Sequence, residues 1–198
     1  MYVLGLTGSI GMGKTTTAML FAEEGVPVHD ADATVHRLYE NEAVAAIEAA
    51  FPGTTQDGKV NRGLLGEQVV NDPAALKRLE SIVHPLVRAA EQDFLRKAEA
   101  AGAAVAVLDI PLLLETGGEQ RVDGVVVVTA PAEVQRARVL ERGVPAEKFE
   151  ALLGHQMPDA EKRRRADFIV DSSQGIEPAR EQVRAILDKI ATMPAKPR

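Results

Sequence analysis

Gly8-Ser9-Ile10-Gly11-Met12-Gly13-Lys14-Thr15 is the stretch that decides the fold of this chain. It matches the pattern G-x-x-x-x-G-K-[ST], in which a glycine-rich loop between a strand and a helix cradles phosphate groups. The apolar residues 2–7 predict a buried strand before the loop, and residues 16–24 predict a helix after it, which Gly25 ends. This order favours a phosphate-binding site over a glycine-rich turn that binds nothing.

Each residue type in the loop suits a nucleoside triphosphate. The glycines let main-chain N–H groups approach an anion at the positive end of the following helix. Lys14 is expected to reach the β- and γ-phosphates, which makes it a catalytic residue, and the Thr15 hydroxyl is expected to hold Mg²⁺. The sequence therefore predicts ATP as the phosphate donor, with contacts from Gly8, Gly11, Met12, Gly13, Lys14, Thr15 and Thr16.

The composition is that of an ordinary globular protein, with 198 residues of which 45% are hydrophobic and 26% charged. The absence of cysteine excludes disulfides, thiolate zinc sites and cysteine nucleophiles. A net charge of −6 disfavours a dedicated nucleic-acid binder, since the basic run 162–165 is short. Without a membrane-length apolar run or a leader, we expect a cytoplasmic enzyme with neither nucleic-acid nor membrane partners. The oligomeric state stays open.

An acidic pair follows the predicted second strand, residues 26–29. Asp30 and Asp32 lie at its carboxyl end, where ligands bind in open α/β sheets. The glycine loop lies at the same kind of end, so the pair and the loop are expected to face one cleft. Asp30 has an equally good alternative role as the N-cap of the next helix.

The stretch from residue 34 to 101 is predicted to be mostly helical, with a turn at 57–59. Asp72 and Pro73 start a long helix whose apolar residues recur at helical spacing. Pro85 predicts a kink or a break in this helix, because proline removes a main-chain hydrogen bond. So long a block exceeds an ordinary crossover and indicates an inserted, substrate-covering subdomain.

Three further strands are predicted at 103–108, 125–129 and 168–171, and a last helix at 176–190. Asp109 follows the first of these strands, at the position where a Walker B strand carries the carboxylate that assists Mg²⁺. The signal is weak by itself, because many strands end in aspartate. Strands alternating with helices predict an α/β fold, with three layers around a parallel sheet, an inserted helical subdomain and a helical lid. We expect a frayed tail at 194–198.

Arginines are concentrated between residues 136 and 165, and mobile arginine-bearing helices suit a lid over triphosphate. Arg138 and Arg142 are one helical turn apart, and at least one is expected to contact ATP phosphates. The alternative to a lid role is a solvated helix face, and we favour it for at least one of the three arginines at 163–165. The expected boundaries within the single domain 1–198 are a core of 1–32, 103–135 and 166–192, a helical subdomain of about 33–102 and a lid of about 136–165.

Several motifs together resemble the bacterial dephospho-CoA kinases over nearly the whole chain. They are the glycine loop, Asp30-Ala31-Asp32, His84-Pro85-Leu86 and Asp109-Ile110-Pro111-Leu112-Leu113-Leu114-Glu115, with Gln156, Lys162 and Ala166-Asp167 matching in spacing. The resemblance implies a three-layer parallel-sheet P-loop kinase fold with an inserted helical substrate subdomain and a helical lid. It also implies ATP-dependent phosphorylation of the ribose 3′-hydroxyl of dephospho-CoA, the last step of coenzyme A synthesis.

The resemblance also implies roles for residues outside the loop. Asp32 corresponds to the catalytic, substrate-binding carboxylate, and His84, Arg88 and Leu112 to further substrate contacts. The chain departs from the family at Leu152, where arginine is frequent, and at Thr116-Gly117-Gly118, where some members carry asparagine.

Two alternatives remain in view. A shikimate-type kinase also pairs a P-loop with Asp-x-Asp. Such kinases carry a glycine triplet near the end of the third strand, whereas this chain has only two glycines, Gly117-Gly118, and they lie too far beyond the end of that strand. The chain has neither the guanine-reading motif of GTPases nor the signature of transporter ATPases. A nucleotide-sensing module would bind ATP without transferring phosphate to an acceptor. Measuring phosphate transfer to a small acceptor therefore distinguishes a kinase from such a module.

Overall fold

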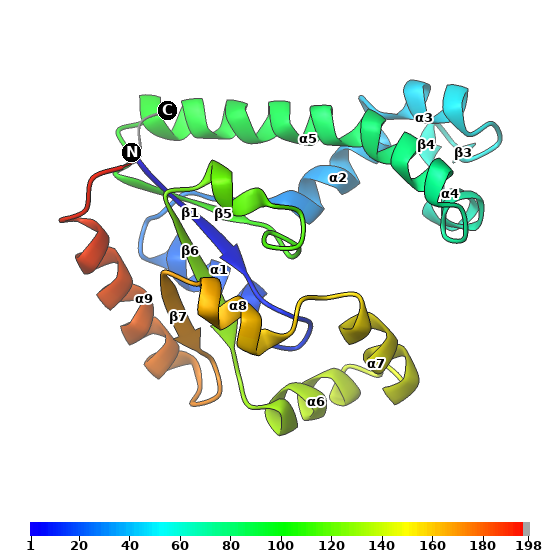
Figure 1. Cartoon of the computed structure of the whole chain (residues 1–198). Coiled ribbons are helices and arrows are strands. Elements are labelled where there is room, and N and C mark those ends of the chain that lie inside the picture. Colours follow the sequence, from blue (N-terminus) through cyan, green and yellow to red (C-terminus); the bar gives the residue numbers. More distant parts are fainter. Residues whose placement is uncertain (196–198) are drawn as a thin grey trace. The chain divides into compact units, whose positions relative to one another are not determined.

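The computed structural model describes residues 1–195. The chain forms two compact units, of which the first comprises residues 1–29 and 98–198 and the second Asp30–Lys97. Figure 1 shows the elements of both. Residues 196–198, part of the predicted frayed tail, lie outside the described residues.

A five-stranded sheet forms the centre of the first unit, in the order β2-β5-β1-β6-β7. Its strands are β1 Tyr2–Thr7, β2 Val28–Asp30, β5 Val105–Asp109, β6 Gly124–Thr129 and β7 Phe168–Asp171. β1 pairs in parallel with β5 and β6, and β6 pairs in parallel with β7. Every residue of β1 is buried, as expected for a parallel strand covered on both faces.

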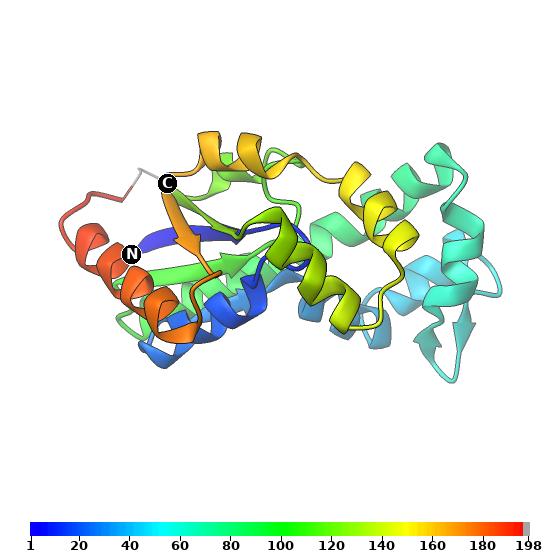
Figure 2. The same ribbon diagram turned by 90° about the horizontal axis from the view of Figure 1, so that it is seen from below.

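Helices cover both faces of this sheet (Figure 2). α1, Lys14–Glu23, and α9, Ile176–Ile190, pack against each other on one face, and α8, Asp159–Arg165, lies against β6 on the other. The segment 110–122 also packs on the sheet, because a Cβ on Gly5 would lie 2.5 Å from Leu113 Cδ2. α6, Ala132–Glu141, and α7, Ala146–Gly154, complete the unit. The predicted three-layer α/β kinase fold is confirmed.

The second unit is mainly helical and has its own apolar core. Its elements are α2 Ala31–Glu40, α3 Val44–Ala50, β3 Thr55–Gln56, β4 Lys59–Val60, α4 Arg62–Val69 and most of α5 Pro73–Ala100. Leu38, Ile47, Phe51, Leu65 and Val83 are among the buried residues of that core. The apolar periodicity of α5 therefore serves this core.

The structure refines three predictions for the chain from the second strand to the long helix. β3 and β4 form a small antiparallel hairpin inside the stretch predicted to be mostly helical, and the predicted turn at Asp57 and Gly58 joins them with positive φ angles of 50° and 75°. Of the predicted kink or break at Pro85, the break does not occur, since α5 is one helix through Pro85; Figure 1 shows a bend in its axis, which agrees with the kink. The second strand starts two residues later than predicted, because Pro27 cannot donate to the ladder.

The boundaries elsewhere differ by few residues. α1 begins at Lys14 instead of Thr16, and a 3₁₀ helix, η1 at Gly118–Arg121, was not predicted. Residues 136–165, the predicted lid, lie within the first unit together with the sheet. Among residues 1–195 no helix is both long and apolar enough to cross a bilayer.

Candidate active site

The glycine loop has the backbone geometry that the sequence pattern requires. Gly11 and Gly13 have φ angles of 79° and 88°, in the left-handed region that favours glycine. An added Cβ would lie 2.5 Å from Val139 Cγ2 at Gly11, 2.9 Å from Ser172 Oγ at Gly13, and 2.8 Å from a main-chain oxygen of β6 at Gly8. No larger side chain fits these three positions without displacing a neighbour.

The N-terminus of α1 is left without a side-chain cap. Gly13 is its N-cap residue and forms no side-chain hydrogen bond there, so the first N–H groups of the helix are available to an anion. Thr15 and Thr16 follow in the first turn and are exposed. This arrangement fits a bound phosphate group.

Lys14 points at a buried carboxylate. Its Nζ lies 2.6 Å from Asp109 Oδ1 at the end of β5, and the Asp109 side chain is nearly inaccessible to water. The neighbouring strands β1 and β5 bring the two residues together at their carboxyl ends. Asp109, the predicted Walker B residue, is thus the partner that orients the lysine of the loop.

Side chains from distant elements hold the backbone of the loop from both sides. The Ile10 N–H donates to Gln156 Oε1 at 3.2 Å, and Gln135 Nε2 donates to the Ile10 carbonyl at 2.7 Å. The Met12 carbonyl accepts a hydrogen bond of 2.8 Å from Ser172 Oγ. Sequence reasoning found Gln156 only through the family resemblance. It missed Gln135 and Ser172, for which no local pattern exists.

Arg138 and Arg142 lie in different surroundings although they are one helical turn apart. Arg138 donates from Nη1 to Ser172 Oγ at 2.8 Å and from Nη2 to the Ser172 carbonyl at 2.7 Å, beside Gly13. Arg142 is the exposed C-cap residue of α6 and, among the described residues, forms no side-chain hydrogen bond or ion pair. Only Arg138 therefore adjoins the glycine loop in this structure.

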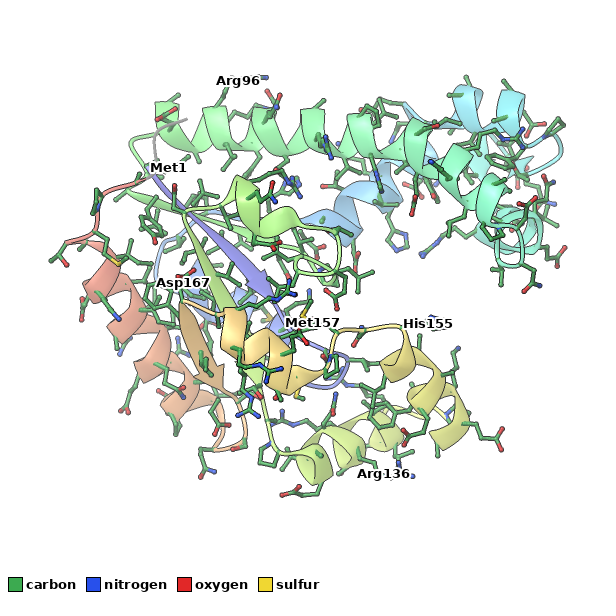
Figure 3. All side chains as sticks on the ribbon, viewed as in Figure 1. Met1, Arg96, Arg136, His155, Met157 and Asp167 are labelled. Atoms are coloured by element: carbon green, nitrogen blue, oxygen red, sulfur yellow. The ribbon has the colours of Figure 1, made fainter. Side chains whose placement is uncertain are left out.

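A buried ion pair joins α8 to the segment after β5. Lys162 is fully buried and its Nζ lies 2.9 Å from Glu115 Oε1, in a direction outside hydrogen-bond geometry. The same Glu115 oxygen accepts the N–H of Met157, which Figure 3 labels between α7 and α8. Burial acts most strongly on the Glu115 carboxyl and raises its pKa. The Lys162 ammonium and the Met157 N–H outweigh that effect and hold the pKa below its ordinary value.

The remaining basic residues of α8 form a solvated face. Arg163 pairs with Asp159, and Arg164 and Arg165 pair with Glu161, all at helical spacing. Their side chains are 46 to 75% exposed. This outcome agrees with the solvated-face alternative for these arginines.

A cavity of about 410 Å³ lies beside the loop in the first unit. It is lined by side chains of the loop, the β6–α6 connection and α8, including Met12, Gln135, Asp159 and Arg163. The Asp159 carboxylate accepts a hydrogen bond from Thr129 and forms an ion pair with Arg163, which neutralises the charge of Asp159. The glycines and Lys14 are absent from the lining, so we do not assign the phosphates to it.

Two aspartates of the second unit take different positions. Asp30 is the N-cap residue of α2, and its Oδ1 accepts the Ala33 N–H at 2.9 Å. The capping alternative for Asp30 is therefore confirmed. Asp32 lies in the first turn of α2 and is exposed.

The other predicted substrate contacts are exposed side chains. His84 and Arg88 are one turn apart on α5, and Leu112 is 41% exposed in the turn after β5. No cluster of three or more metal-ligating side chains occurs among residues 1–195. A magnesium ion bound chiefly by water and phosphate oxygens needs few protein ligands, so the free Thr15 hydroxyl fits it.

Comparison with known proteins agrees with this geometry. The family model described as "Dephospho-CoA kinase" matches residues 2–178. A dephospho-CoA kinase of Rhodopseudomonas palustris is 67% identical over 197 residues, which cover 99% of both chains.

Solved structures share the fold as well. TT1252 from Thermus thermophilus is 37% identical with a TM-score of 0.86, over 95% of this chain and 97% of the other. A Campylobacter jejuni dephospho-CoA kinase is 25% identical with a TM-score of 0.63, over 95% and 96%. On the full-length match of sequence and the geometry of the glycine loop, the chain belongs to the dephospho-CoA kinase family.

Proposed function

We propose that the chain transfers the γ-phosphoryl group of ATP to the ribose 3′-hydroxyl of dephospho-CoA, giving CoA and ADP. The observation that carries this proposal is the uncapped, glycine-lined N-terminus of α1, with Lys14 in its first turn held by Asp109, in a chain matching a family member over its full length. Dephospho-CoA is thus favoured over shikimate as the acceptor.

The loop binds and orients the donor. The N–H groups of the glycine loop and of the first turn of α1 hold the phosphates, and Lys14 neutralises charge on the β- and γ-phosphates. Asp109 keeps the lysine aimed through their 2.6 Å contact. The Thr15 hydroxyl would hold Mg²⁺, which would supply further charge neutralisation on the phosphates.

Asp32 is proposed as the proton acceptor. The 3′-oxygen forms a bond to the γ-phosphorus as the bond to the ADP oxygen breaks, and the hydroxyl proton passes to the Asp32 carboxylate. The Asp32 carboxylate is exposed in the first turn of α2, where an acceptor hydroxyl can reach it. Asp30 cannot serve as readily, because its carboxylate is engaged in capping α2.

The charge that develops during transfer requires cations beside the loop. Arg138 is proposed to contact ATP phosphates, supported by its place beside Gly13, and Arg142 to join it when residues 136–165 close as a lid. His84, Arg88 and Leu112 are proposed to contact the acceptor. The location in the cytoplasm stays a prediction.

A coupled assay of ADP release tests the proposal. With Mg·ATP, dephospho-CoA should support turnover with CoA identified by mass, while shikimate and no acceptor give only background. Turnover with shikimate and none with dephospho-CoA would contradict the assigned acceptor. Tight ATP binding without transfer to either acceptor would instead favour a nucleotide-sensing module.

A further inference from the structure

Arg62 of the second unit is bonded to an imidazole instead of a carboxylate. Its Nη1 lies 2.7 Å from His36 Nε2 and 3.3 Å from His36 Nδ1, and both side chains are exposed. Arg62 is the first residue of α4, and His36 lies in the middle of α2. Among residues 1–195, Arg62 forms no ion pair with an acidic side chain.

Other cations near this pair have a partner. Arg37, the neighbour of His36, bonds Glu42 at 2.8 Å, and Lys59 bonds Glu40 at 2.8 Å. The contrast shows that carboxylates are available on these elements, yet none neutralises Arg62.

A guanidinium held in this way is suited to an anion. Arginine carries five N–H donors in a planar fork, and a contact to one imidazole leaves most of them free. The His36 imidazole contacts Nη1 alone, so it positions the guanidinium without occupying the other nitrogens of the fork. Arg62 also lies at the positive N-terminal end of α4. The local charge is therefore uncompensated and directed to the surface.

The position of His36 relative to Asp32 on α2 indicates which anion Arg62 would bind. Asp32 and His36 are four residues apart in this helix, so they lie on one face, about 6 Å apart along the axis. In an adenosine ribose, the 3′-oxygen and the 5′-phosphorus are separated only by C3′, C4′, C5′ and O5′. A ribose whose 3′-hydroxyl meets Asp32 can thus place its 5′-phosphate beside His36 and Arg62.

We propose that Arg62, positioned by His36, binds the 5′-diphosphate bridge of the acceptor. This inference rests on the proposed function, because it takes the 3′-hydroxyl at Asp32 as its reference point. The diphosphate is the anionic part of dephospho-CoA, so its recognition sets both the affinity and the orientation of the ribose. Acceptors with a sugar hydroxyl but no neighbouring diphosphate are discriminated against here.

The test compares Arg62→Gln with wild-type protein by calorimetric titration of dephospho-CoA. Loss of a charge-assisted contact to a diphosphate should weaken binding about tenfold or more. The dissociation constant of the wild-type complex should rise with added NaCl, and that of Arg62→Gln should rise less steeply. The KM for ATP and the thermal midpoint should stay unchanged. Arg62→Lys should recover part of the affinity, because it keeps the charge without the planar fork.

Arg37→Gln is the matched control, since it removes an arginine of α2 that already has an acidic partner. Its dephospho-CoA affinity should stay within twofold of wild type. The inference is overturned if Arg62→Gln binds within twofold of wild type with the same salt dependence. It is also overturned if Arg62→Gln and Arg62→Lys lose thermal stability and affinity for both substrates together, which would indicate an α2–α4 structural link. Failure of the proposed function is distinct, because wild-type protein would then form no CoA.

Discussion

The buried pair of Lys162 and Glu115 should make a large and asymmetric contribution to stability. Lys162 is 0% exposed and, among residues 1–195, pairs with no other acidic side chain, whereas the Glu115 side chain is 16% exposed and also accepts the Met157 N–H. Glu115→Gln therefore leaves a fully buried ammonium uncompensated, at a cost of about 3–5 kcal/mol. Lys162→Met leaves a carboxylate on a partly exposed side chain that keeps the hydrogen bond from Met157, at a cost of about 1–3 kcal/mol.

The double variant tests whether these costs arise from the pair. Replacing both members removes both charges, so the combined loss should be smaller than the sum of the single losses. For a chain of this length, Glu115→Gln should lower the thermal midpoint by about 6 to 20 °C. Circular dichroism during heating and urea titration of the three variants measures these differences. Additive losses, or a Glu115→Gln cost below about 1 kcal/mol, would refute the reasoning.

The pair also predicts a direction of pH dependence. The pKa of Glu115 is held below its ordinary value, so the folded chain binds fewer protons at this site than the unfolded chain. Its contribution is complete above the ordinary pKa of a glutamate and is lost as the pH falls through the lowered folded value. The stability difference between wild type and Lys162→Met should therefore narrow on acidification, as urea titrations across that range would measure. A difference that widened towards acid pH would contradict this sign.

Three further predictions concern catalysis. Lys14→Ala should reduce transfer by orders of magnitude with an unchanged circular dichroism spectrum, because its charge serves the phosphates; an unfolded variant would instead reveal a structural role. Asp32→Asn should abolish most single-turnover transfer while ATP still binds, and Asp30→Asn should be mild, since asparagine caps helices nearly as well; the reverse order would exchange the two roles. Arg138→Ala should lower kcat more than Arg142→Ala, with dephospho-CoA binding nearly unchanged. Wild-type kinetics in both variants would contradict the proposed phosphate contacts of these two arginines.

Local patterns determined much of the fold and the centre of the site. The glycine loop, the buried strands and α9 follow from residue type and spacing alone. Positive φ angles such as those of Gly11 and Gly13 favour glycine, and a run of apolar residues such as β1 indicates a buried strand, so both features can be read from adjacent residues. The capping role of Asp30 was likewise visible as one of two alternatives, because an N-cap is a local hydrogen bond.

Only the tertiary structure decided which charged residues are buried and which remain free. Lys162 begins a run of four basic residues, yet it is fully buried because Glu115, far away in sequence, lies opposite it, while the three arginines after it stay in water. Ser172 reaches the Met12 carbonyl for the same reason: parallel strands bring residues from distant segments to one edge of the sheet. Such pairings depend on the packing of whole elements, and short-range periodicity contains no information about them.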